Sequence, residues 1–113
     1  MDIIITDRRL SKCANDNRKR VREYGKRQSD LIGVRLGELK AADNLEVMRA
    51  LPRARCHELS GDRKGQLAVD LDYPFRLIFV PNHNPVPMKT DGGLNWSEVI
   101  CIEVIEVVNY HED

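Results

Sequence analysis

The spacing of apolar residues changes once along the chain, and this change constrains the fold more than any other feature of the sequence. In the first half, apolar side chains recur every three or four residues, as they do along one face of a helix. From Leu67 onward they recur at every second residue, as in a strand that is buried on one face. The pattern predicts helices packed on one face of a mostly antiparallel sheet, which is an α+β domain.

Two antiparallel helices are expected after a short β-branched strand at residues 2–6. Thr6 or Asp7 can cap the first helix, and Ser29 or Asp30 can cap the second, because their side-chain oxygens accept unpaired backbone N–H groups. The expected apolar stripes are Leu10, Cys13, Ala14, Val21 and Tyr24 in the first helix, and Ile32, Leu36 and Leu39 in the second.

Glycine and proline mark where these helices should end. Gly25 is a natural stop for the first helix, since glycine adopts the left-handed conformation found at helix C-termini. A third helical turn can hold Leu45 and Met48, and it should end before Pro52 because proline cannot continue a helix.

Three strands are expected in the second half, at residues 66–71, 75–80 and 99–108. In the last strand two glutamates lie three residues apart, so strict alternation fails and we expect a bulge or bend near Ile105. Residues 81–96 contain three prolines and two glycines, which predicts a long loop.

The length of the chain allows one domain, residues 1–113, with one core. No apolar segment approaches the ~20 residues of a membrane span, and residues 1–5 are too short and too acidic for a signal peptide. The three cysteines, Cys13, Cys56 and Cys101, are odd in number and widely spaced, which argues against a disulfide framework or a zinc site. We therefore expect a cytoplasmic protein without a membrane partner.

The net charge of zero conceals an asymmetry between the two parts of the chain. Residues 1–40 carry 11 basic and 6 acidic side chains, whereas residues 41–113 carry 7 basic and 12 acidic ones. The basic excess is concentrated around Arg18, Arg20 and Arg22, which can follow a nucleic-acid backbone by displacing its counterions. The alternative is a solvated helix face, which is the more frequent meaning of a charge run.

Side chains suited to phosphodiester chemistry surround the predicted strands. A histidine can transfer protons near neutral pH, and the planar guanidinium of an arginine fits phosphate oxygens. The candidate side chains are His57, Arg63, Lys64, Arg76, Tyr110 and His111.

Three ordered segments of the second half contain these residues. Residues 57–65 read His-Glu-Leu-Ser-Gly-Asp-Arg-Lys-Gly, residues 75–79 read Phe-Arg-Leu-Ile-Phe, and residues 109–111 read Asn-Tyr-His. The segments resemble motifs of the HigB branch of the RelE/ParE toxins of bacterial toxin–antitoxin systems, the plasmid maintenance killer family. The resemblance implies the RelE/ParE fold, in which two N-terminal antiparallel helices pack on a mostly antiparallel sheet.

The resemblance also implies an activity and its residues. The protein would be a growth-inhibiting mRNA endoribonuclease (an mRNA interferase) that acts at the ribosome through attack of the RNA 2′-oxygen, without metal or cofactor. Arg76 would bind the scissile phosphate, His57 and His111 would act as acid or base, and Tyr110 would stack on a base or donate to the phosphate. A helix-turn-helix antitoxin of the HigA type would be the partner, besides the ribosome and its mRNA. The implied contacts to the RNA backbone come from Arg63 and Lys64.

Two departures from the family pattern keep a second function open. Ser60 stands where a lysine is common, and Asn109 stands where an aspartate is common, so the site has one cation and one ionisable group fewer. These departures and the neutral net charge favour a ParE-like toxin that binds DNA gyrase without catalysis, or a weakened regulatory relative. A regulator that binds operator DNA should show a helix-turn-helix pattern, and the sequence shows none.

The individual candidates also have structural alternatives. A histidine at the end of a strand, such as His57, is more often structural than catalytic. Arg76 can be an ordinary strand arginine that pairs with Asp70 or Asp72. The turn around Gly65 is explained by glycine alone, because glycine readily takes a positive φ.

Overall fold

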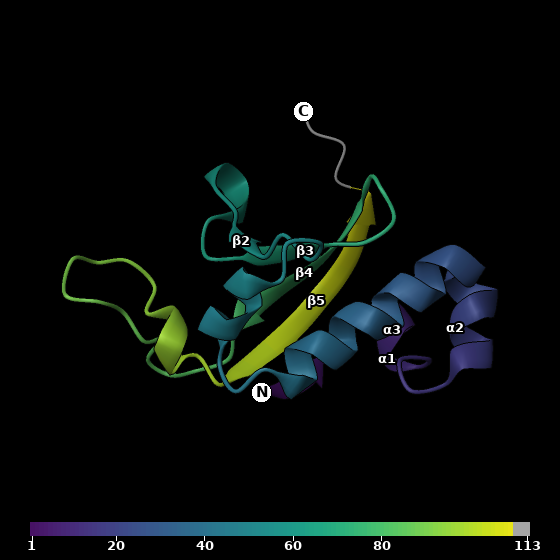
Figure 1. Cartoon of the computed structure of the whole chain (residues 1–113), viewed down its shortest axis with the longest axis horizontal. Helices are drawn as coiled ribbons and strands as arrows, with labels where there is room; N and C mark the ends of the chain where they lie inside the picture. The colour runs from purple at the N-terminus through teal and green to yellow at the C-terminus, as the bar shows by residue number, and fades with distance from the viewer. Residues whose placement is uncertain (110–113) are drawn as a thin grey trace.

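The computed structural model describes residues 1–109 and shows an α+β fold built on one five-stranded sheet (Figure 1). The order of the strands across the sheet is β1-β5-β4-β3-β2. The elements are β1 (Asp2–Ile5), α1 (Arg8–Ser11), α2 (Asn17–Tyr24), α3 (Lys26–Ala41), η1 (Leu45–Ala50), β2 (His57–Glu58), η2 (Gly61–Arg63), β3 (Leu67–Asp70), β4 (Phe75–Pro81), η3 (Trp96–Glu98) and β5 (Cys101–Asn109), where η denotes a 3-10 helix.

The sheet is mixed, because β1 runs parallel to β5 whereas every other pairing is antiparallel. The expected strands in the second half are confirmed, and so is the irregularity near Ile105. Ile78 pairs with Glu106, whereas Phe79 pairs with Val104, so that Ile105 is the extra residue of a β-bulge. Because the bulge absorbs one residue, the apolar side chains before and after it point to the same face of the sheet although the alternation in the sequence is interrupted.

The prediction of one continuous first helix is wrong. The segment forms two short helices, α1 and α2, separated by a turn. The side chain of Asp7 accepts a hydrogen bond from the N–H of Leu10 (2.8 Å), and Asp16 accepts one from the N–H of Lys19 (3.1 Å). Asp16 therefore starts a new helix, since a side chain that binds backbone N–H groups competes with helix continuation. The Asp7 cap itself is confirmed.

The predicted start of the second helix at Ser29 or Asp30 is also wrong, because α3 begins at Lys26. Gly25 ends α2 with φ 84°, as expected, and the same residue directly precedes α3. Ser29 is fully buried instead, and both its carbonyl and its hydroxyl accept hydrogen bonds from Arg20 Nε at 3.1 Å. The helices are not confined to the N-terminal part either, since the 3-10 helices η2 and η3 lie in the strand-rich half.

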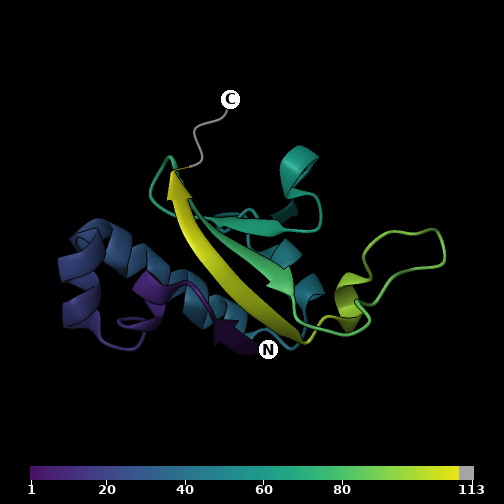
Figure 2. The same cartoon turned by 180° about the vertical axis from the view of Figure 1, so that it is seen from behind.

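Helix α3 covers one face of the sheet, which we call the inner face. Figure 2 shows the strands in front of α3, so the opposite face, the outer face, is turned toward the viewer there. The inner-face core includes Ile32 and Leu39 of α3, together with strand residues such as Leu77 and Phe79. Leu45 and Met48 of η1 also belong to this core, and η1 ends before Pro52. The predicted third helical turn is therefore confirmed. The packing of the helices on the sheet therefore confirms the α+β prediction.

The loop between β4 and β5 forms an arm that extends away from the sheet (Figure 1). Residues 82–95 contain no regular strand, and an isolated bridge joins Met88 to Leu94. The arm ends in η3, where the Trp96 indole N–H donates to Glu58 Oε2 at 2.9 Å. The prediction of a long loop is confirmed, and the Trp96 contact fixes its base against β2.

None of the helices within residues 1–109 combines the length and the apolar character needed to cross a bilayer.

Candidate functional site

The strand pairings bring candidate residues from four strands to the outer face. His57 pairs with Ala68, and Ala68 pairs with Ile78, so these side chains share one face of the sheet. Ile78 in turn pairs with Glu106, and Asp70 pairs with Arg76. Because side chains two residues apart on a strand point the same way, Arg76 lies on the same face as Ile78. The predicted pair His57 and Arg76 is thus brought to one surface.

A small apolar cluster forms the floor of this surface. Leu59, Ala68 and Ile78 are buried there, and Ile105 and Val108 pack against them. The charged side chains therefore stand around an apolar patch that excludes part of the solvent. A lower local dielectric strengthens the electrostatic interactions of groups at its rim.

Two carboxylates accompany the arginines of the outer face. Arg76 Nε lies 3.4 Å from Asp70 Oδ1, and Arg55 Nε lies 2.6 Å from Asp70 Oδ2. Asp70 raises the pKa of the Arg55 guanidinium, through a side-chain hydrogen bond and its negative charge. Arg63 Nη1 lies 2.7 Å from Glu106 Oε2 and also donates to Gln66 at 2.8 Å. The ion pair between Arg76 and Asp70, which the sequence allowed as an alternative to a role in binding phosphate, is therefore observed.

The end of β3 is fixed from the inner side by a buried arginine. Arg35 of α3 is 6% exposed and donates to the carbonyl oxygens of Asp70 (2.6 Å) and Arg53 (3.1 Å). Arg55, two residues after Arg53, has a φ of 46°, which is a left-handed backbone conformation that is uncommon for residues other than glycine. The backbone on both sides of the Asp70 carboxylate is consequently held in place.

His57 is half-buried at the start of β2, and one nitrogen of its ring is fixed by the backbone. Its Nδ1 lies 2.6 Å from the carbonyl oxygen of Arg55. A carbonyl oxygen can only accept, so Nδ1 carries the hydrogen and Nε2 is the basic nitrogen of the neutral ring. Such a histidine is equipped for proton transfer through Nε2, as a general base or, once protonated, as a general acid.

The other predicted residues are distributed over different surfaces. Lys64 is exposed and lines a groove, whereas its neighbour Arg63 is used in the ion pair with Glu106. Arg18 and Arg22 are exposed on α2, away from the outer face. Tyr110 and His111 lie outside the described residues, and β5 is described as far as Asn109.

Arg20 has an internal role that the sequence did not indicate. Besides its bonds to Ser29, its Nη1 donates to the carbonyl of Ala14 (2.8 Å) and its Nη2 to Asn17 (3.3 Å). Its guanidinium joins α2, α3 and the turn between α1 and α2. This extensive internal bonding leaves little of the guanidinium for RNA.

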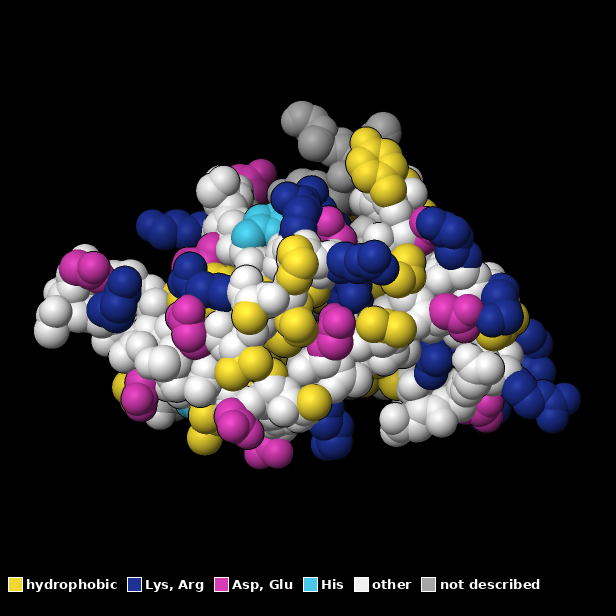
Figure 3. Space-filling model, viewed as in Figure 1, with side chains coloured by type: hydrophobic (Ala, Val, Ile, Leu, Met, Phe, Trp, Pro, Cys, Tyr) yellow, Lys and Arg dark blue, Asp and Glu magenta, His cyan; other side chains and the backbone are white. Residues whose placement is uncertain are grey.

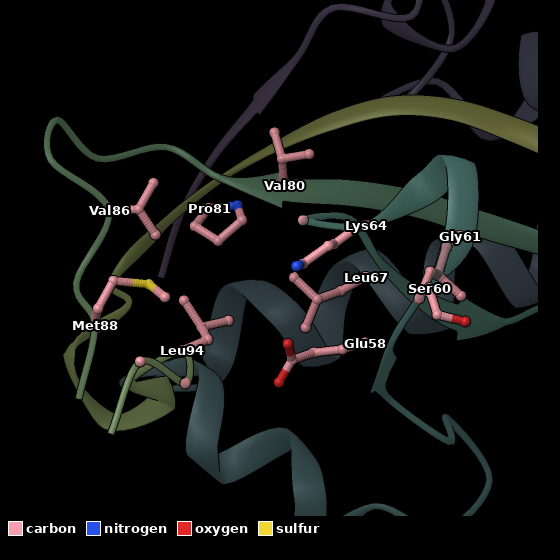
Figure 4. Close-up of a pocket in the computed structure, with 14 residues that line it drawn as sticks. Glu58, Ser60, Gly61, Lys64, Leu67, Val80, Pro81, Val86, Met88 and Leu94 are labelled. Carbon is pink, nitrogen blue, oxygen red and sulfur yellow. The ribbon is translucent and has the colours of Figure 1, made fainter. Parts of the chain in front are cut away.

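A groove beside the outer face is lined mainly by apolar side chains of the sheet, of the turn at residues 59–65 and of the arm. It has a volume of about 460 Å³. Figure 4 shows Lys64 and Glu58 directed toward Leu94 in this groove. Glu58 is already bonded to Trp96, so the groove contains one cation and one anchored carboxylate. The labelled apolar side chains in Figure 4 are Leu67, Val80, Pro81, Val86, Met88 and Leu94.

Three residues of the outer face were missed by sequence reasoning as site residues: Arg55, Asp70 and Glu106. The alternation along β3 predicted that the Asp70 side chain points to the face of the sheet opposite to that of Val69. The irregular spacing of the two glutamates in β5 indicated the bulge beside Glu106. Those signals located the residues on strands, but the ion pairs depend on which strands become neighbours.

Among residues 1–109, no group of three or more His, Cys, Asp or Glu side chains is arranged to hold a metal ion. Cys13, Cys56 and Cys101 are free thiols. Burial raises the pKa of the Cys56 thiol to about 12, which opposes thiolate formation and thus nucleophilic reactivity at neutral pH.

Comparisons with protein-family models, with curated proteins and with solved structures find no match to this chain.

Proposed function

We propose that this chain is a HigB-like toxin of the RelE/ParE superfamily that cleaves mRNA at the ribosome. The observation that carries the proposal is the presence of His57 and Arg76 on one face of the sheet, over a shared apolar floor. The resemblance of the three sequence segments supplies the reaction. The outer face supplies a proton-transfer group and a guanidinium within the same surface.

In the proposed reaction, RNA lies across the outer face without help from a metal or cofactor. Arg76 binds the scissile phosphate and stabilises the extra negative charge that develops on its oxygens. His57 takes the proton from the attacking 2′-hydroxyl or gives one to the leaving 5′-oxygen, through Nε2. Tyr110 and His111 complete the proposed site, with His111 in the other proton-transfer role.

The ion pair with Asp70 defines a requirement of this proposal. Arg76 must exchange at least part of its contact with Asp70 for the phosphate. Arg55 favours this exchange, because it lies closer to Asp70 than Arg76 does and keeps the carboxylate neutralised. Among the described contacts of Arg76, the one that the RNA phosphate must displace is this long ion pair with Asp70.

The test is to induce the protein in a bacterial host and to map new 5′ ends across the transcripts. The doubly substituted variant His57→Ala/Arg76→Ala is compared with Arg53→Ala, in which an exposed arginine of the turn before β2 is removed. In-frame cuts that persist in Arg53→Ala and disappear in the double variant are expected. Loss of the acid or base alone, in His57→Ala, should reduce the cleavage rate about 10²–10⁴-fold.

A ParE-like toxin that binds gyrase is the second candidate, and the occupied arginines favour it. Asp70 and Glu106 neutralise charge that an RNA-binding face would use. Growth arrest with intact mRNA, equal in the wild type and the double variant, would replace the nuclease by this candidate. An assay of DNA supercoiling by purified gyrase, with and without the protein, then distinguishes a gyrase inhibitor from a toxin that binds another target.

A further inference from the structure

The two short N-terminal helices enclose a basic hollow that lies apart from the outer face. Its volume is about 430 Å³. Figure 3 shows Lys and Arg side chains gathered at the end of the molecule where α2 lies. The residues that line it are Arg8, Arg9, Lys12, Cys13, Lys19, Arg22 and Glu23.

The single carboxylate in this hollow is already used. Glu23 forms an ion pair with Arg9, whose Nη2 also donates to the Glu23 carbonyl at 3.0 Å. Arg9 further lies over the ring of Tyr24, 4.9 Å from its centroid. These contacts tie α1 to α2, so they fix the shape of the hollow and engage the one carboxylate among its lining residues. The Asp16 carboxylate, outside the lining, interacts electrostatically with Lys19 and Arg22.

Four cations remain around the hollow without an ion pair to any part of the described chain: Arg8, Lys12, Lys19 and Arg22. All four side chains are exposed. Their spread over two helices exceeds what one phosphate group needs, and it suits several negative charges in succession. The Arg20 bonds to Ser29, described above, hold α2 against α3 behind them.

We propose that this hollow binds a run of phosphate groups, as presented by a nucleic-acid backbone or by polyphosphate. Arginine and lysine neutralise successive phosphates and release their counterions, which is the main source of sequence-independent affinity. The sequence pointed to Arg18, Arg20 and Arg22, whereas the structure assigns the binding to Arg8, Lys12, Lys19 and Arg22. The proposal goes beyond cleavage of mRNA and does not depend on it.

The test uses the full chain and measures binding, not cleavage. Probes are a fluorescein-labelled single-stranded RNA of about 12 nucleotides, an RNA duplex of about 12 base pairs, and inorganic polyphosphate as competitor. Polyphosphate has no 2′-hydroxyl group, so its binding is independent of the proposed nuclease. The variant Lys12→Glu/Lys19→Glu is compared with Lys40→Glu/Lys89→Glu, in which two exposed lysines outside the hollow undergo the same charge change.

We expect the Lys12→Glu/Lys19→Glu variant to lose at least about tenfold in affinity for RNA and polyphosphate, and the control to lose much less. The salt dependence should also weaken, by about 1.4 in the slope of log K against log salt for the single strand, because two phosphate contacts are removed. Equal losses in both variants would show an effect of net charge alone and would overturn the proposal. So would the absence of binding by the wild type at low salt.

The relative affinities then identify the source of the phosphates. Tighter binding of either RNA than of polyphosphate, at equal phosphate concentration, assigns the hollow to a nucleic-acid backbone. Equal affinities assign it to phosphate groups irrespective of what carries them. Thermal unfolding of both variants checks that the exposed substitutions leave the fold intact.

Discussion

The inner and outer faces of the sheet are built from the same strands but are stabilised differently. On β4, Leu77 and Phe79 are fully buried in the inner core, and Ile78 between them is fully buried on the outer face. The inner core is continuous with α3 and η1, whereas the outer cluster is small and is bordered by the Arg76–Asp70 and Arg63–Glu106 ion pairs. Packing thus determines stability on one face, while the other can carry charge and chemistry.

The largest effect on stability is expected for the inner face. Phe79→Ala should lower the free energy of unfolding by about 3–5 kcal/mol, because it removes a fully buried aromatic side chain and leaves a cavity. Urea denaturation measures the change, and Tyr73→Ala, at a side chain that is 87% exposed, is the control. A cost below about 1 kcal/mol for Phe79→Ala would mean that the inner face is not the main core.

Cys56 packs against the inner core and provides a pH-dependent test of the same face. Burial disfavours the thiolate and raises the pKa of Cys56 in the folded protein from its ordinary value of 9.0 to about 12. The contribution of the neutral Cys56 thiol to the free energy of unfolding is fully present below pH 9. It is lost as the pH rises from about 9 to about 12. We expect a loss of about 2 kcal/mol from this thiol, allowing for the part of the side chain that water reaches.

The measurement is urea denaturation between pH 8 and pH 11 with wild type and Cys56→Ala. The variant should show a flatter decline with pH, since it lacks the thiol that titrates. Parallel curves for the two proteins would show that water reaches Cys56 freely and that the inner face is open there. At pH 8, iodoacetamide should modify Cys56 only slowly in the folded protein.

The smallest effect on stability is expected for the ion pairs of the outer face. Asp70→Asn should cost about 1 kcal/mol or less, since Arg55 and Arg76 remain partly accessible to water. If the outer face binds RNA, the same substitution should raise its affinity several-fold, because both guanidinium groups lose their carboxylate. Fluorescence anisotropy with a short RNA measures this change.

Asp91→Asn is the matched control, because Asp91 forms an exposed pair with Lys89 in the arm. It should change neither stability nor RNA affinity. A fall in RNA affinity in Asp70→Asn would contradict the view that Asp70 competes with phosphate. A stability loss near that of Phe79→Ala would abolish the contrast between the two faces.

The regular parts of the fold could be predicted because their signals are local. Alternation along β4 assigned Leu77 and Phe79 to one face and Ile78 to the other, and the interrupted alternation in β5 located the bulge at Ile105. Two helix boundaries, the cap at Asp7 and the stop at Gly25, were also predicted from local signals. The starts of α2 after Asp16 and of α3 at Lys26 were not predicted, because several residues of the first half can act as caps.

The candidate site was only partly accessible from the sequence. The residue types at His57 and Arg76 indicated phosphodiester chemistry, and strand periodicity gave their direction. Asp70 was one of two possible partners of Arg76, but the contact between Arg55 and Asp70 could not be predicted, because it depends on the backbone before β2 and on its position beside β3.

By itself, the sequence determined the α+β class, the two-sided pattern of the strands and the types of side chain available for chemistry. Those properties follow from the order of residues over a few positions, through side-chain periodicity and backbone preference. Only the tertiary structure decided that Asp70 and Glu106 neutralise arginines and that Arg20 is used internally, whereas Lys12 and Lys19 face a common hollow. Electrostatic contacts act between residues that are distant along the chain, so they exist only once the strands and helices have packed.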